Sequence, residues 1–141
     1  MKRVAWLILP VVWMAPLSAA RACDCIGPKP PLEARAESAA VFEGTVIGMV
    51  PTGYIRNGFP SRVDVTFNVT RVWKGAEMLQ VHLSTPGTGS MCGYSFKAGE
   101  RYLVYARDDG HGQLVTTLCD RTRPLKEAAE DLKAFSTDSH P

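Results

Sequence analysis

Two cysteines separated by one residue, Cys23-Asp24-Cys25, form the most distinctive chemical pattern in the chain. As free thiols, such a pair binds a soft metal such as copper or exchanges disulfides, because thiolates are nucleophilic and prefer soft metal ions. The chain has two further cysteines, Cys92 and Cys119, so in an oxidising compartment we expect all four to form two disulfides. A redox or copper-handling role for Cys23 and Cys25 is the minor alternative.

The other residue types offer no catalytic pattern. The chain has no G-x-S-x-G, no H-E-x-x-H, no phosphate-binding glycine loop and no dinucleotide fingerprint. Its three histidines, His82, His111 and His140, lack the short spacing of a metal site, and we expect them to be structural or surface residues. The sequence therefore predicts a protein that is not an enzyme and has no cofactor of its own.

The first 22 residues have the pattern of a secretory signal peptide. A positively charged start and an apolar run over residues 4–14 are followed by small residues. That run has 11 residues, whereas a membrane-spanning helix needs about 20. Cleavage after Ala22 would make Cys23 the first mature residue, and cleavage after Ala20 would leave Arg21 first.

An N-terminal cysteine that is held by a disulfide has a second possible use. Its α-amino group has a reference pKa near 7.7–8.0 and is partly neutral at pH 7. The amine and the carbonyl oxygen of Cys23 would form a five-membered chelate with a metal ion, and so occupy the open water position of a catalytic zinc in another protein. Cys25 would hold the same backbone two residues later, which lowers the entropic cost of association.

The positions of the four cysteines limit how they pair. A Cys23–Cys25 bridge would close a strained ring around one residue, so we expect each of the two to pair with Cys92 or Cys119. The spacing alone leaves both remaining pairings open. Either one closes loops of roughly 70 to 95 residues, and each crosslink is worth on the order of 4 kcal/mol in the chain-entropy model.

Hydrophobic patterning predicts a mainly β domain. Alternating apolar residues indicate a strand most clearly over residues 63–70, and the alternation slips in phase at Thr70 and Arg71, as a β-bulge would cause. Residues 51–60, with their Gly and Pro, are predicted as a loop or hairpin tip. The other expected strands cover residues 41–50, 79–83, 101–107 and 113–118.

Two helices are expected beside the strands. Residues 32–40 are rich in Ala and Glu, and apolar residues recur at helical spacing over 125–135, after a proline, Pro124, that suits a first helical turn. We expect the second helix to pack on the strands and residues 136–141 to form a frayed tail. Five bent strands favour a small closed β-barrel, whereas an immunoglobulin-like sandwich would need about seven.

The overall composition suits one exported domain. The chain has 141 residues, of which 45% are hydrophobic and 21% charged, and its formal net charge of +2 is too small to indicate nucleic acid or an anionic membrane as a partner. Loss of the first 22 residues would remove three basic residues and leave 119 residues with a formal charge of −1. We expect a monomeric domain over residues 23–135, without a membrane anchor, secreted to the medium or, in a bacterium, to the periplasm.

The start of the mature chain also resembles a known family. Cys23-Asp24-Cys25, followed by Pro28 and Pro30, is similar to the N-terminus of the tissue inhibitors of metalloproteinases. Further matching segments follow in the same order, at residues 40–42, 91–93, 100–104 and 117–120. The resemblance covers nearly the whole mature chain, to about residue 125.

This resemblance implies a fold, a disulfide pairing and a binding site. The implied fold is a five-stranded OB-fold barrel of the netrin-like type, with Cys23 paired to Cys92 and Cys25 paired to Cys119. By analogy, the Cys23 amine and carbonyl chelate the zinc of a target protease, and Asp24 enters the adjacent specificity pocket. The residues that the resemblance places on the protease-binding ridge are Cys23, Asp24, Cys25, Ile26, Ser90, Met91 and Cys92.

The chain departs from the animal inhibitors in three ways. Residues 34–38 lack a further cysteine that those proteins carry, only a helix follows the expected barrel in place of a second Cys-rich domain, and Asp24 stands where the family usually has a small hydroxyl residue. A carboxylate in an apolar pocket costs on the order of several kcal/mol unless it is paired. The leading hypothesis is a secreted inhibitor of zinc metalloendopeptidases, and the alternative is a non-inhibitory netrin-like module that binds another protein.

Overall fold

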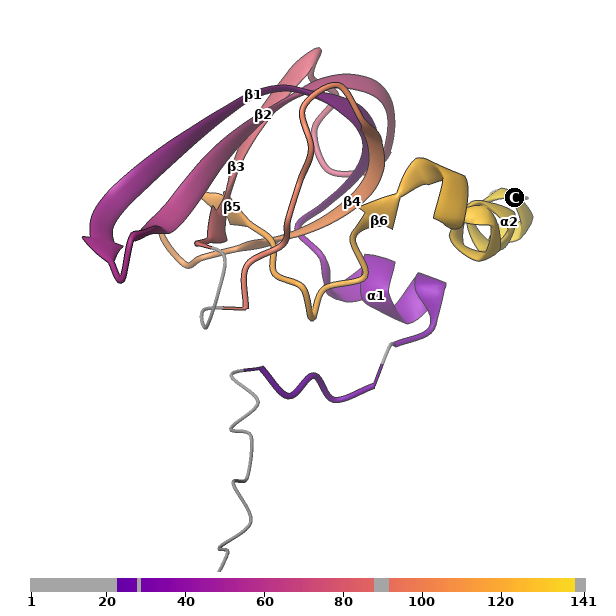
Figure 1. The fold of residues 1–141 in the computed structure, drawn as a ribbon. Helices are drawn as coiled ribbons and strands as arrows, with labels where there is room; N and C mark the ends of the chain where they lie inside the picture. Colours follow the sequence, from indigo (N-terminus) through magenta and orange to yellow (C-terminus); the bar gives the residue numbers. More distant parts are fainter. Residues whose placement is uncertain (1–22, 28, 88–91, 139–141) are drawn as a thin grey trace, which may run out of the picture.

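The computed structural model describes residues 23–27, 29–87 and 92–138, which form one β-sheet with two α-helices beside it (Figure 1). The expected signal peptide, residues 1–22, lies outside the described residues. In chain order the elements are α1 (Pro31–Glu37), β1 (Ala40–Arg56), β2 (Phe59–Lys74), β3 (Gln80–Pro86), β4 (Arg101–Asp108), β5 (Leu114–Val115), β6 (Arg123–Pro124), the 3₁₀ helix η1 (Leu125–Glu127) and α2 (Ala129–Asp138).

Five of the six strands form a ring. The strand order in the sheet is β1-β2-β3-β5-β4-β6, and β1 also pairs with β4. The ring therefore joins β1, β2, β3, β5 and β4, and the two-residue β6 adds to β4 outside it. This arrangement agrees with the mainly β prediction and its five strands, whereas a single sheet contradicts the two-sheet immunoglobulin-like alternative.

The hairpin of β1 and β2 is longer than predicted. Residues 51–60, predicted as a loop, are mostly strand, and only Asn57 and Gly58 form the turn. Both have positive φ, 53° and 81°, as a two-residue hairpin turn requires. Pro51 is tolerated inside β1 because β4 pairs with β1 only as far as Thr45, so the edge of β1 near Pro51 is not paired with β4.

The predicted phase slip in β2 is confirmed. The register changes from Gly44 opposite Val69 to Glu43 opposite Arg71, so Thr70 has no partner residue on β1. A bulge bends its strand and increases the local twist. The resulting curvature, visible in Figure 1, lets β1 pair with β2 on one side and with β4 on the other.

β5 is shorter than the strand predicted over residues 113–118. Only two residues pair as strand. The Thr116 N–H still donates to the Ser84 carbonyl of β3 at 3.0 Å, but the side chains of Thr116 and Thr117 bind other groups. The Thr116 hydroxyl donates to the Tyr105 carbonyl at 2.9 Å, and the Thr117 hydroxyl donates to Asp120 Oδ2 at 2.8 Å. Side chains that bind nearby backbone or loop groups compete in this way with strand pairing.

The helix boundaries also differ from the prediction. α1 ends at Glu37, since Ser38 is extended (φ −77°, ψ 148°), and Ala40 already begins β1. Pro124 lies in β6 and precedes η1, so it does not begin the α-helix. α2 continues through residues 136–138, which were expected to fray, and residues 139–141 lie outside the described part of the chain.

The domain has two hydrophobic clusters, one inside the ring and one beneath α2. Aromatic residues dominate the inner cluster, where the rings of Phe67 and Phe96 lie 5.2 Å apart in an edge-to-face contact. α2 packs against the outer face of β1 and β4, as the helical spacing predicted. The buried residues of this second cluster are Val41, Leu103, Tyr105, Ala128 and Phe135.

Candidate functional site

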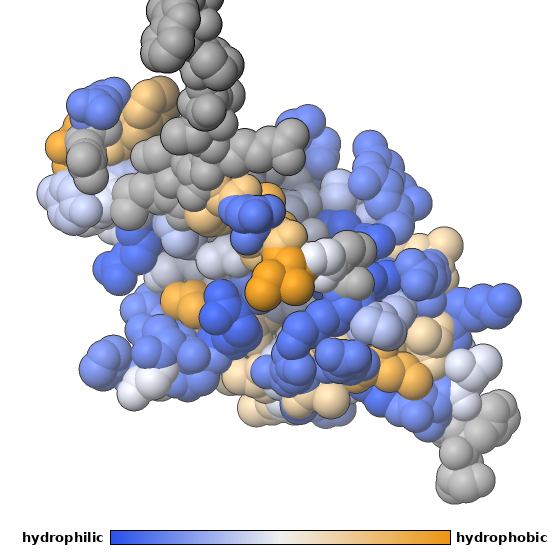
Figure 2. Space-filling model, turned by 90° about the horizontal axis from the view of Figure 1, so that it is seen from below, coloured by the Kyte–Doolittle hydropathy of each residue, from blue (hydrophilic) through white to orange (hydrophobic). Residues whose placement is uncertain are grey.

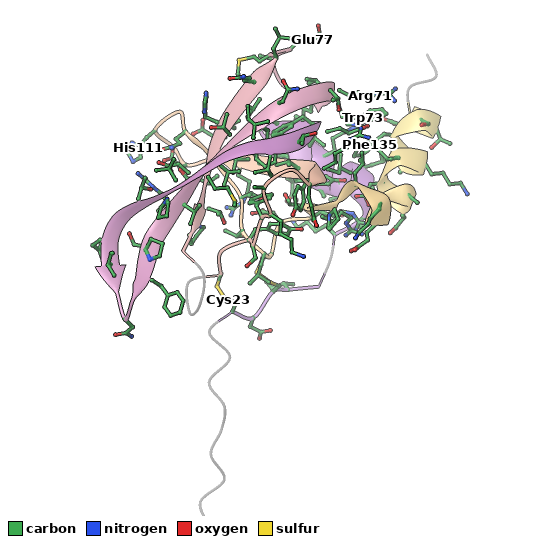
Figure 3. All side chains as sticks on the ribbon, turned by 45° about the horizontal axis from the view of Figure 1, so that its top comes forward. Cys23, Arg71, Trp73, Glu77, His111 and Phe135 are labelled. Atoms are coloured by element: carbon green, nitrogen blue, oxygen red, sulfur yellow. A yellow bond between two sulfur atoms is a disulfide. The ribbon has the colours of Figure 1, made fainter. Side chains whose placement is uncertain are left out.

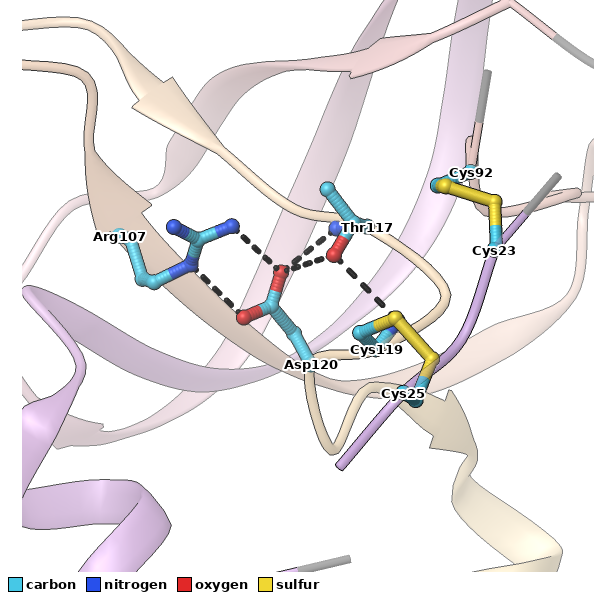
Figure 4. The surroundings of a disulfide bond; sticks show 7 residues. All are labelled: Cys23, Cys25, Cys92, Arg107, Thr117, Cys119 and Asp120. Atoms are coloured by element: carbon cyan, nitrogen blue, oxygen red, sulfur yellow. Dashed lines mark hydrogen bonds and ion pairs between the residues drawn. A yellow bond between two sulfur atoms is a disulfide. The ribbon is translucent and has the colours of Figure 1, made fainter. Parts of the chain in front are cut away.

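The N-terminal segment, residues 23–27, is tied to the body of the domain by two disulfides (Figure 4). Cys23 pairs with Cys92 and Cys25 with Cys119, with Cα–Cα distances of 5.5 Å and 5.2 Å. This is the pairing that the family resemblance implies, and one of the two that spacing leaves open. Because all four cysteines are disulfide-bonded, the interpretation of Cys23 and Cys25 as free redox or copper-binding thiols is wrong.

Side chains alternate along this segment between the domain and solvent. Cys23 and Cys25 are partly buried at their disulfides, whereas Asp24 is exposed and the Ile26 side chain is 100% exposed. Alternation of this kind is typical of extended backbone. Two bridges two residues apart therefore hold the backbone and leave the Asp24 and Ile26 side chains accessible to another molecule.

The loop that carries Cys119 is fixed by hydrogen bonds to Asp120. The Thr117 backbone N–H donates to Asp120 Oδ2 at 2.7 Å, and Arg107 Nε donates to Asp120 Oδ1 at 2.8 Å (Figure 4). The Cys119 N–H donates to Thr117 Oγ1 at 3.3 Å. These contacts hold residues 117–119 in a loop, whereas the predicted strand continued to residue 118.

The Cys92 side of the site is held by a close backbone approach. A Cβ added at Gly93 would meet the Pro86 carbonyl oxygen at 1.8 Å, so only glycine fits at this position. Cys92 has a φ of 56°, which is uncommon outside glycine, and its carbonyl accepts the Leu118 N–H at 2.9 Å. This hydrogen bond joins the loops of Cys92 and Cys119, so both disulfides belong to one framework.

Three exposed apolar side chains lie in the N-terminal segment, in α1 and in the loop that carries Cys119. Ile26, Leu32 and Leu118 are 100%, 40% and 48% exposed. Figure 2 shows the face of the domain that carries the N-terminal segment, where hydrophobic side chains lie among mostly hydrophilic ones. Leu118 was missed at the sequence level, because an apolar residue between Thr117 and Cys119 fits the pattern of a strand.

A cleft of about 720 Å³ separates the N-terminal segment from the body of the domain. Residues of the N-terminal segment, α1, β4 and the loop around Cys119 line it, together with Tyr94. Burial raises the pKa of Tyr94 to about 12, so its phenol is protonated at neutral pH. Because of this cleft, the segment is held by specific contacts more than by close packing.

The structure brings together the predicted site residues that it describes, namely Cys23, Asp24, Cys25, Ile26 and Cys92. Ser90 and Met91 lie outside the described residues. His82 and His111 are exposed, in agreement with the surface role expected for them. Within the described ranges, no group of three or more His, Cys, Asp or Glu side chains is arranged to hold a metal ion.

The structure is a small disulfide-linked β domain. It consists of a ring of five strands with two helices, and its exposed N-terminal C-x-C segment is bonded to two neighbouring loops. The family model described as tissue inhibitor of metalloproteinase matches residues 21–135. Because this match spans most of the chain, the protein belongs to that family, whose members are inhibitors and not enzymes.

No curated protein matches the chain. The family assignment therefore rests on the family model together with the cysteine framework. A membrane-spanning helix would have to be longer and more apolar than any helix that the structure describes in this chain.

Proposed function

We propose that the protein is a secreted inhibitor of zinc metalloendopeptidases that acts through its N-terminal residue. The observation that supports this most directly is the double tether, since Cys23 and Cys25 are both bonded to the domain while Asp24 and Ile26 are exposed. A rigid, exposed backbone loses little conformational entropy when it binds. Family membership supplies the class of partner, a metalloproteinase.

The proposed chemistry uses the α-amino group and the carbonyl oxygen of Cys23. After cleavage behind Ala22, the amine has a reference pKa near 7.7–8.0 and is partly neutral at pH 7. The amine nitrogen and the carbonyl oxygen would form a five-membered chelate with the zinc that the protease supplies, and take the place of the water that the protease activates. The inhibitor needs no metal or cofactor of its own.

Other residues of the proposed ridge would contact the protease on either side of its zinc. Asp24 would enter the protease pocket next to the zinc. Ile26 would lie further along the substrate-binding cleft of the protease, where residues 90–92 would also make contact. We also propose that the ring of strands is a closed OB-fold barrel of the netrin-like type, and that the mature domain is a monomer outside the cytoplasm.

One observation favours a second function, a netrin-like module that binds another protein without inhibition. Asp24 is an exposed carboxylate at the position that would enter an apolar protease pocket, where an unpaired charge is costly. In this alternative the same exposed segment recognises a partner that pairs with the Asp24 carboxylate.

The decisive experiment compares two forms of the protein whose intact masses are known. One form begins at Cys23 and the other carries a single Ala before Cys23, and both are titrated against a panel of zinc metalloendopeptidases. We expect inhibition by the first form only, because the extension removes the amine from the chelating position. Equal inhibition by both forms would rule out chelation, and inhibition by neither would favour the binding module.

A further inference from the structure

Arg121 connects the N-terminal segment to α2. Its side chain is only 6% exposed although it carries a permanent charge. The guanidinium donates from Nε to Asp131 Oδ1 at 2.5 Å, from Nη1 to the Lys29 carbonyl at 2.7 Å, and from Nη2 to Glu130 Oε2 at 2.7 Å. The Lys29 carbonyl near the start of the domain and two neighbouring carboxylates of α2 thus meet on one side chain.

The acceptor that fixes Arg121 is completely buried. Asp131 is 0% exposed, and besides Arg121 it accepts a hydrogen bond from the Tyr105 hydroxyl at 2.5 Å and faces Arg123 Nη1 at 3.7 Å. Burial alone would lower the pKa of Arg121, but the hydrogen bonds and charges of Asp131 and Glu130 together outweigh it and raise the pKa. Arg121 therefore stays charged. Its guanidinium also keeps one orientation, because a buried ion pair is stable only when its hydrogen bonds are satisfied.

The loop of Cys119 and Arg121 holds the N-terminal segment at two points. Cys119 bonds covalently to Cys25, and Arg121, two residues later, binds the Lys29 carbonyl, four residues beyond Cys25. Ile26 lies between these two points, above the cleft that separates the segment from the domain. Lys29 also forms ion pairs with Glu33 and Glu37 of α1 through its side chain, whereas the Arg121 contact restrains its backbone carbonyl and so complements the disulfide.

We propose that Arg121 is a positioning residue for the inhibitory segment, which it holds in its binding conformation through the Lys29 carbonyl, with Asp131 of α2 as its anchor. The inference rests on the proposed function only where it concerns inhibition. The order of the segment itself does not depend on any protease. A helix at the end of the domain thereby controls the conformation of residues at its beginning.

Arginine is required for this role because its planar guanidinium presents several N–H donors in a fixed geometry. A lysine at this position would keep a positive charge beside Asp131 but has a single ammonium group on a flexible stem, and would not reach both Asp131 and the Lys29 carbonyl in the same geometry. Arg121→Lys therefore separates the positioning contact from the charge that the buried Asp131 needs.

The test measures ¹⁵N relaxation of the folded domain for the backbone amides of Ile26, Gly27 and Lys29. In Arg121→Lys we expect these amides to become more mobile on the picosecond to nanosecond timescale, while the amides of α2 remain rigid. Inhibition should weaken by about tenfold, since the segment must then be ordered during binding. Unchanged amide mobility together with unchanged inhibition would overturn the proposal.

Two matched variants control for loss of charge and for a general structural role. Glu130→Gln removes the charge of the exposed partner of Arg121, and Arg123→Gln removes the second cation beside Asp131, but neither residue contacts the Lys29 carbonyl. Both should leave the mobility of Ile26 and Gly27 unchanged. If either variant mobilises the segment as strongly as Arg121→Lys, the positioning role is wrong and the whole ion-pair network stabilises the region.

A measurement on the unmodified protein covers the case in which Arg121→Lys does not fold. We expect separate, slowly exchanging Nη resonances for Arg121, with nuclear Overhauser contacts from Nη1 protons to Lys29. A single averaged Nη signal without such contacts would contradict the proposal. If the relaxation results hold but neither protein form inhibits any protease, the positioning role stands and the inhibitor function fails.

Discussion

Asp24 is the exposed side chain between the two disulfide-bonded cysteines. If Asp24 enters an apolar pocket, Asp24→Thr removes the cost of burying an unpaired carboxylate and should lower the inhibition constant by about tenfold or more. The measurement is titration against the panel of metalloendopeptidases. Asp24→Asn is the matched control, since it removes the charge and keeps the shape. Unchanged or weaker inhibition by the Thr variant would contradict this placement of Asp24.

Gly93 determines how closely the Cys92 segment can approach β3. Gly93→Ala would place a Cβ 1.8 Å from the Pro86 carbonyl oxygen, so the backbone must move. We expect a loss of about 1–3 kcal/mol in the free energy of unfolding, as in other overpacked sites, measured by urea denaturation. Gly27→Ala is the control, because no atom lies within 4 Å of its added Cβ and little change is expected. Equal stability of the two variants would refute the close contact.

At the residue level, the sequence predicts the cysteines and their neighbours better than it predicts what holds them. The C-x-C pattern and its resemblance to a family indicate Cys23 to Ile26, because adjacent residues form a recognisable motif. Arg121 and Asp131 carry no such signal. They are ten residues apart on different elements, and an Arg in a loop is usually solvated, so only the folded structure shows that this pair is buried.

Among the elements, the sequence predicts a strand feature well when neighbouring residues determine it. It predicts the end of a strand poorly when pairing with a distant strand determines it. The bulge in β2 is visible in the sequence because a slip in alternation changes which residues face the core. The length of the β1–β2 hairpin is not visible, since Pro51 normally indicates a turn. Whether a proline interrupts a strand depends on which edge is paired, and here β4 pairs with β1 only up to Thr45.

The loop between β4 and β5 makes the stability of the domain depend on pH. The exposed Asp109 carboxylate accepts the His111 and Gln113 N–H groups at 2.8 Å and 3.1 Å, and these bonds lower its pKa. The unfolded chain therefore binds a proton more readily, and stability falls as the pH drops through the lowered pKa. Asp109→Asn should be less stable than the original protein at pH 7, with the difference disappearing in acid. Urea midpoints from about pH 7 to pH 2 measure this, and a constant difference would contradict it.

The Phe135 side chain of α2 is 0% exposed and lies 5.1 Å from the Trp73 ring (Figure 3). Phe135→Ala should cost about 3–5 kcal/mol of unfolding free energy, because a large buried ring leaves a cavity. Trp73 fluorescence during urea unfolding reports both stability and the loss of this contact. Ser136→Ala, an exposed neighbour in α2, should change stability by about 0.5 kcal/mol or less. A similar small effect at Phe135 would show that α2 does not depend on this packing.

The whole molecule combines a core inside the ring of strands with an N-terminal segment that belongs to neither hydrophobic cluster. Strand pairs and two hydrophobic clusters stabilise the ring and α2, whereas residues 23–27 and Lys29 are held by two disulfides, the Arg121 contact and the ion pairs of Lys29 with α1, with a cleft behind them. This division suits a recognition segment, because exposed backbone is available for binding and its conformation is fixed by bonds that do not bury it.

Loss of the Cys25–Cys119 bridge should therefore affect both stability and recognition. In the chain-entropy model this crosslink, with a sequence separation of 94, is worth about 4–5 kcal/mol, and Cys25→Ser with Cys119→Ser should lower the free energy of unfolding by that amount. Replacing Cys23 and Cys92 by serine opens a bridge of separation 69 and should cost almost as much, which makes it the matched control for stability. In the variant without the Cys25–Cys119 bridge, Cys23 keeps its own bridge and its amine. A loss of inhibition by the folded form of this variant therefore measures how much the second bridge orders the segment. An unchanged urea midpoint would refute the entropic role of the crosslink. Unchanged inhibition would show that one disulfide is enough to order the N-terminus.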